Sequence, residues 1–77
     1  MTIELVKILE AAKFAWIAFC KYYEDKENAE SEEMRNVYDR LMNEAHASYR
    51  AFCKSYEFCT GRSICGISQL EEELAQC

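Results

Sequence analysis

The chain has 77 residues and a formal net charge of −5, with 51% hydrophobic residues, 30% charged residues, no proline and two glycines. This is about half the length of a typical domain, so we expect one compact unit or one part of an assembly. The composition excludes a collagen-like chain and argues against a turn-rich β-sandwich. The acidic balance argues against direct nucleic-acid binding, which needs an excess of lysine and arginine.

No membrane-targeting segment is evident in the sequence. The longest apolar run, residues 14–20, lies between Lys13 and Lys21 and is far shorter than the roughly 20 residues that span a bilayer. Glu4 and Glu10 precede it, which is atypical of the positively charged start of a signal peptide. We therefore expect no membrane contact and a soluble protein of the cytoplasm.

The first predicted helix covers residues 3–25. Thr2 is a favourable N-cap, and Glu4 puts a negative charge in the first turn, where the helix dipole favours it. Apolar and small residues recur at helical spacing and form one broad face. Its members are Leu5, Ile8, Leu9, Ala12, Ala15, Trp16, Phe19, Cys20 and Tyr23.

The predicted connection, residues 26–31, is strongly acidic. Six carboxylates fall within ten positions around it and form what we call the acidic cluster: Glu24, Asp25, Glu27, Glu30, Glu32 and Glu33. Lys26 is the one cation among those ten positions. One interpretation is a solvated loop with carboxylates placed favourably at a helix start. The other is docking onto a basic surface, because close carboxylates imitate the charge density of DNA phosphates.

The second predicted helix covers residues 32–59. Ser31 is its expected N-cap, and Gly61 stands just beyond its end, where a left-handed residue commonly terminates a helix. The predicted buried stripe consists of Met34, Val37, Tyr38, Leu41, Ala45, Ser48, Tyr49, Phe52, Tyr56 and Cys59. A turn over residues 60–67 and a short helix over residues 68–76 follow. Ser68 and Glu71 fit a capping box there, and the glutamates 71–73 are expected on the surface.

These elements predict an all-α fold, an antiparallel two-helix hairpin plus a short C-terminal helix, in a single domain over residues 1–77. A hairpin folded near Asn28 pairs residues whose numbers sum to about 57. Trp16 then faces Leu41, and Phe19 faces Tyr38, so that each pair is apolar.

A second apolar strip lies on the expected polar side of the first helix. It contains Ile3, Val6, Phe14 and Ile17. The last three are the candidate interface residues, and we call these three the apolar strip. One alternative is that the third helix folds over the strip. The other is an interface with another protein or with a second copy, and a homodimeric four-helix bundle is the simplest arrangement that hides it.

No catalytic motif is present, and we expect a protein that is not an enzyme and has no cofactor. His46 stands alone at the edge of the second helix's stripe, which is typical of a structural histidine. Cys59, Cys65 and Cys77 suggest a zinc site, but their spacings are longer than those of structural knuckles. Free, mostly buried and reduced thiols are the simpler interpretation.

The combination of small size, acidity, the Glu24–Glu33 cluster and aromatic helices is similar to small phage-encoded inhibitors of host defence nucleases, the anti-CRISPR and anti-restriction proteins. This resemblance covers size, charge and architecture. It implies a non-enzymatic module that blocks a basic surface of a larger nucleic-acid-binding protein. The alternative is a self-associating structural or ligand-holding bundle with no external macromolecular target.

Overall fold

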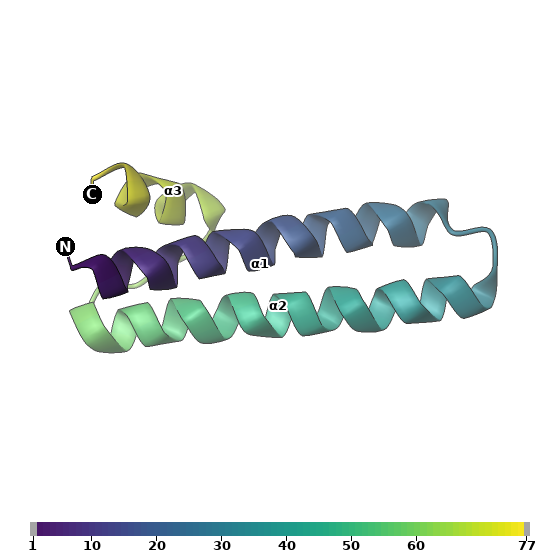
Figure 1. Cartoon of the computed structure of the whole chain (residues 1–77), viewed down its shortest axis with the longest axis horizontal. Coiled ribbons are helices and arrows are strands. Elements are labelled where there is room, and N and C mark those ends of the chain that lie inside the picture. Colours follow the sequence, from purple (N-terminus) through teal and green to yellow (C-terminus); the bar gives the residue numbers. More distant parts are fainter. Residues whose placement is uncertain (1, 77) are drawn as a thin grey trace.

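Two long antiparallel helices form a hairpin, and a short third helix lies beside the first (Figure 1). The computed structural model describes residues 2–76, and that range contains no strand. Helix α1 covers Ile3–Asn28, α2 covers Glu32–Thr60 and α3 covers Ile67–Ala75. The molecule measures 45 × 20 × 19 Å. The all-α hairpin with a short C-terminal helix is therefore confirmed.

Three of the four ends of the long helices are fixed by the predicted local signals. The Thr2 hydroxyl accepts a hydrogen bond from the Leu5 N–H at 3.3 Å, and the Ser31 hydroxyl accepts one from the Met34 N–H at 3.2 Å. Gly61 follows α2 with φ 73°, and its N–H donates to the Glu57 carbonyl at 2.7 Å. All three caps are confirmed, because capping depends on neighbouring residues alone.

Helix α1 continues three residues beyond its predicted end, to Asn28. The predicted turn over residues 26–31 was therefore wrong in extent, and the connection consists of residues 29–31. The Lys26 ammonium donates to the Asp39 carboxylate of α2 at 2.8 Å, which joins the last turn of α1 to its neighbour. A cation in the last turn also interacts favourably with the helix dipole.

Helix α3 begins at Ile67, and its N-cap is Gly66 without a side-chain hydrogen bond. The predicted capping box at Ser68 was therefore wrong. Gln69 makes similar capping contacts instead. Its side-chain oxygen accepts a hydrogen bond from the Cys65 N–H at 2.9 Å, and its side-chain amide donates one to the Ser63 carbonyl at 2.6 Å. This reach-back from the third helical position holds the linker, residues 61–66, against the start of α3.

The core lies at the end of the rod where the chain termini are, because α3 and the linker add apolar residues there (Figure 1). Its buried apolar members come from all three helices and the linker: Leu9, Ala12, Tyr49, Cys53, Tyr56, Ile64 and Leu70. Toward the hairpin turn, the helices are joined by half-buried rings and by the Lys26–Asp39 pair. The packing is thus concentrated at one end of the molecule.

The register between α1 and α2 differs from the predicted one. Trp16 packs against Tyr49 with ring centroids 5.1 Å apart, and Phe19 packs against His46 at 5.2 Å. Each partner lies eight positions beyond the predicted one. The connection is centred on residue 30, which raises the sum of paired residue numbers from about 57 to 60 and accounts for three of these positions. Side chains also lean toward the N-terminus of their own helix, which raises the sum of paired residue numbers in an antiparallel pair.

The seam on α2 is also rotated relative to the predicted stripe. Cys53, outside that stripe, is buried, whereas Ser48 and Cys59 are exposed. Met34, Val37 and Phe52 are exposed as well, at 44%, 39% and 37%. The predicted stripe was wrong at these five positions. Their apolar surface therefore remains outside the hairpin seam.

Candidate functional site: the acidic end of the hairpin

The structure gathers the acidic cluster at the end of the rod farthest from the termini. Three members belong to the last turns of α1, one to the connection and two to the first turn of α2. Asp25 is half-buried, and the other five carboxylates are exposed. Ser31 caps α2 within this group, so the helix dipole of α2 favours Glu32 and Glu33. The short connection brings the six side chains together.

The nearest cation is not available to neutralise the cluster, because Lys26 is paired with Asp39 across the hairpin. Its hydrogen bond to Asp39 raises the pKa of Lys26, so the ammonium stays charged and engaged there. Arg35 is the next cation along α2. The six carboxylates against Lys26 and Arg35 leave −4 of the chain's net −5 within residues 24–35. The molecule's charge is therefore concentrated at this end.

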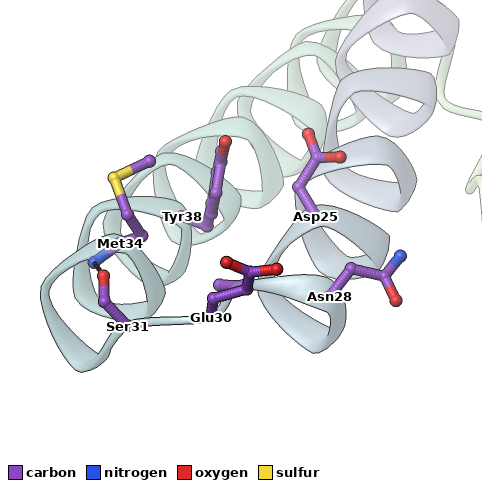
Figure 2. A pocket seen from close by; sticks show the side chains of 7 residues that line it. Asp25, Asn28, Glu30, Ser31, Met34 and Tyr38 are labelled. Carbon is purple, nitrogen blue, oxygen red and sulfur yellow. Dashed lines mark hydrogen bonds between the residues drawn. The ribbon is translucent and has the colours of Figure 1, made fainter.

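A shallow hollow lies between the two helices at this end (Figure 2). Tyr38 and Met34 line its α2 side, and Asp25 and Glu30 bring carboxylates from α1 and the connection. An aromatic ring beside carboxylates is the combination that holds a guanidinium or ammonium group, through cation–π contact and charge-assisted hydrogen bonds. The hollow is thus suited to a basic side chain. The sequence predicted the carboxylates of this hollow but not that Tyr38 lines it.

The apolar strip remains partly open. Phe14 and Ile17 are 71% and 51% exposed, and Val6 is half-buried. Phe14 and Ile17 border a groove with Leu74 of α3, so α3 lies beside them without covering them. The alternative in which the third helix covers the strip was therefore wrong for these two residues. Ile17 and Glu24 are seven positions apart on one face of α1 with Lys21 between them, so the strip ends about two helical turns from the acidic cluster.

The glutamate that sequence reasoning placed wrongly is Glu73. It was expected on the surface, but it is buried and accepts hydrogen bonds from the Tyr56 hydroxyl at 2.7 Å and from the Arg62 guanidinium at 2.9 Å. Burial, followed by the bond to Glu73, raises the pKa of Tyr56. These contacts fasten α3 to the end of α2. The signal in the sequence is the position of Glu73 beside Leu70 and Leu74 on the inward side of α3.

The remaining candidates for chemistry have structural surroundings. His46 is half-buried, with its ring 5.2 Å from that of Phe19 and 6.4 Å from that of Tyr49. Burial raises the pKa of the Cys53 thiol, and burial with the neighbouring thiol raises the pKa of Tyr49 to about 12. Both groups therefore stay protonated at neutral pH, which disfavours nucleophilic attack.

The other cysteines differ from expectation. Cys20, Cys59 and Cys65 are exposed, so the prediction of mostly buried thiols was wrong, and Cys77 lies outside the described residues. Within residues 2–76, no group of three or more His, Cys, Asp or Glu side chains is arranged to hold a metal ion.

Comparisons of the chain with protein-family models, with curated proteins and with solved structures give no match. Among the described helices, none combines the length and the apolar character needed to cross a membrane.

Proposed function

We propose that this chain is a non-enzymatic protein-binding module whose acidic end docks onto a basic surface of a larger protein. The observation that carries the proposal is the concentration of −4 of the net charge of −5 within residues 24–35, at the exposed tip of the hairpin. Such a charge density attracts a basic partner over about one Debye length and speeds its association.

The hollow at the tip supports a specific contact within this attraction. An arginine or lysine of the partner fits between Tyr38 and the carboxylates of Asp25 and Glu30, where its charge meets two acceptors and a ring face. Charged pairs at the rim of such an interface mainly set the association rate and the salt dependence. Phe14 and Ile17 add exposed apolar surface on the same side of α1, about two helical turns from Glu24.

The favoured partner is a cytoplasmic nucleic-acid-binding protein, and the favoured action is occupation of its basic groove. Carboxylates clustered at the tip of a narrow rod compete with phosphates for lysine and arginine side chains. Small size, net charge and the helical hairpin make the chain similar to phage-encoded anti-CRISPR and anti-restriction inhibitors, and we propose that it acts in that manner. No cofactor or direct contact with nucleic acid is part of this mechanism.

The test is affinity capture from a native lysate at about 0.05 M and about 0.5 M salt, with identification of the captured proteins. A nucleic-acid-binding partner is expected at low salt, and it should release its nucleic acid when the chain is added. The variant Glu27→Lys, Glu30→Lys, Glu33→Lys should lose the partner.

The matched control is Glu44→Lys, Glu71→Lys, Glu72→Lys, which makes the same change in net charge at exposed positions outside residues 24–35. This control should keep most of the binding. Equal binding by the tip variant and the wild-type chain would contradict the proposal.

A second candidate function is self-association as a homodimeric four-helix bundle, which serves a structural role without an external target. The observation that favours it is the number of large apolar side chains that the hairpin leaves exposed, among them Phe14, Ile17, Met34 and Phe52. Light scattering across a range of concentrations tests it, because a stable dimer doubles the mass of 9.0 kDa.

A further inference from the structure

One flank of the hairpin is covered by the linker and α3. On α2, the covered flank carries Glu57, whose carboxylate accepts from the Ile64 N–H at 2.9 Å. On α1, Lys13 and Ile17 lie on the side nearest α3 and border a groove with Leu74, although Ile17 stays exposed. A rotation of about 100° per residue then places other residues of both long helices on the opposite flank, which neither the linker nor α3 reaches.

On α1, this uncovered flank presents small side chains between two larger ones. Ala11, Ala15 and Ala18 recur at helical spacing, with Ile8 before them and Tyr22 after them, and all five are half-buried. Alanines at these intervals let another helix approach closely, because no long side chain holds it away. The α1 side of the flank therefore allows another helix to pack closely against it.

On α2, the uncovered flank consists of residues that lie outside the seam between α1 and α2. Met34 and Phe52 are 44% and 37% exposed, Leu41 is half-buried and Ser48 is exposed. Between Ile8 and Tyr22 on α1 and between Met34 and Phe52 on α2, this flank carries no charged residue, and Glu4 and Asp25 bound it on α1. A solvent-facing flank of an amphipathic helix normally carries charged residues, so an uncharged flank on two adjacent helices indicates a surface that is covered in the working state.

We propose that a second copy of this chain packs on the uncovered flank, with α1 of each copy against α2 of the other. The proposal rests on self-association, the second candidate function, and it names the surface used. A twofold axis repeats every contact, so a self-complementary flank is required. This flank meets that requirement, because one of its helices presents small residues and the other presents large ones.

The register of the hairpin supports this pairing. The Trp16–Tyr49 and Phe19–His46 contacts place Phe52 near the level of residue 13, between Ala11 and Ala15, and Ser48 near the level of residue 17, beside Ala18. In the dimer, each Phe52 then lies close to the small Ala11 of the other copy. Each Ser48 lies close to alanines of the other copy, near the middle of the interface. Phe52 thus falls on a small residue, as close packing between helices requires, whereas Leu41 lies near the level of Tyr22.

The size of the flank also fits a second copy. The whole molecule is 45 Å long and 20 Å wide, so a copy that lies along its full length covers at most roughly 900 Å², and a typical stable interface buries about 800 Å² on each partner. This arrangement brings the two acidic ends to the same end of the dimer. Repulsion between them weakens the dimer at low salt, so added salt should strengthen self-association and weaken binding to a basic partner.

The experiment is sedimentation equilibrium of the full chain under reducing conditions, from about 1 μM to about 1 mM and at two salt concentrations. The wild-type chain should form a dimer that tightens with salt. Phe52→Ser should raise the dissociation constant by about tenfold or more, because it removes the largest apolar anchor of the flank. Phe14→Ser is the matched control: it makes the same substitution at a more exposed phenylalanine outside the flank and should leave the constant within about twofold.

The outcomes separate the hypotheses. A wild-type chain that is monomeric up to about 1 mM overturns this proposal and self-association together, and leaves the acidic-end proposal standing. A dimer weakened by Phe14→Ser and not by Phe52→Ser places the interface on the apolar strip and overturns the proposal alone. If Phe52→Ser lowers helix content by circular dichroism, Ser48→Glu replaces it, with Ala47→Glu as control, since both positions are exposed and only Ser48 is on the flank.

Discussion

Replacing Tyr56 by phenylalanine removes the hydroxyl that donates to buried Glu73 at 2.7 Å and leaves the ring in its fully buried place. Glu73 keeps its contact with Arg62 at 2.9 Å but loses one donor in a site with little access to water. A hydrogen bond to a charged group contributes about 1.5–3 kcal/mol to stability. We therefore expect the free energy of unfolding to fall by about 2 kcal/mol, and Tm by about 8–16 °C for a domain of this size.

The assay is thermal and urea unfolding followed by circular dichroism, at a fixed protein concentration. Tyr23→Phe is the control, because Tyr23 is 53% exposed and the same hydroxyl is removed in contact with water. In a Glu73→Gln background, the acceptor is neutral, and the cost of Tyr56→Phe should shrink to about 1 kcal/mol. A Tyr56→Phe variant within about 0.5 kcal/mol of the wild-type chain would refute the idea that this bond fastens α3 to α2.

Two further predictions concern Tyr49 and the glycines. The pKa of Tyr49 is raised to about 12 in the folded chain, so its stabilising contribution is complete below the unfolded value of about 10 and is lost as the pH rises through 12. Urea titrations from about pH 8 to about pH 12 should therefore show that the free energy of unfolding falls by about 2–3 kcal/mol. The variant Tyr49→Phe should reduce this fall. Gly61→Ala should lower the free energy of unfolding by about 1–2 kcal/mol, because φ is 73° there although the added Cβ would meet open space. Gly66→Ala, at an extended φ of 174° and an equally open position, should lower it by less than about 0.5 kcal/mol. Thermal unfolding compares the two variants, and equal losses of stability would contradict the conformational argument.

The sequence predicted the features that depend on neighbouring residues. Thr2, Ser31 and Gly61 were identified as helix ends because a cap requires only the side chain or backbone of that residue and the next turn. The acidic cluster was equally local, since six carboxylates within ten positions remain together in any conformation of the connection.

The features that the sequence did not reveal depend on how the helices meet. Trp16 contacts a residue eight positions further along α2 than predicted, because the shifted centre of the connection and the lean of the side chains both change the register. The Lys26–Asp39 pair crosses the hairpin and could be found only with that register known. Glu73 is buried because Tyr56 and Arg62, from elsewhere in the chain, converge on it. In each case, contacts between distant segments outweighed the local pattern.

The one-sided position of the core gives the rod a gradient of local stability. Near Tyr56 and Leu70, three helices and the linker protect the backbone, so amide protons there exchange only when most of the molecule unfolds. At the tip, a single pair of helices, mostly exposed residues and a three-residue connection permit opening on a smaller scale. The acidic end can therefore fray and re-form while the far end stays folded, which lets its carboxylates adjust to the contours of whatever they contact.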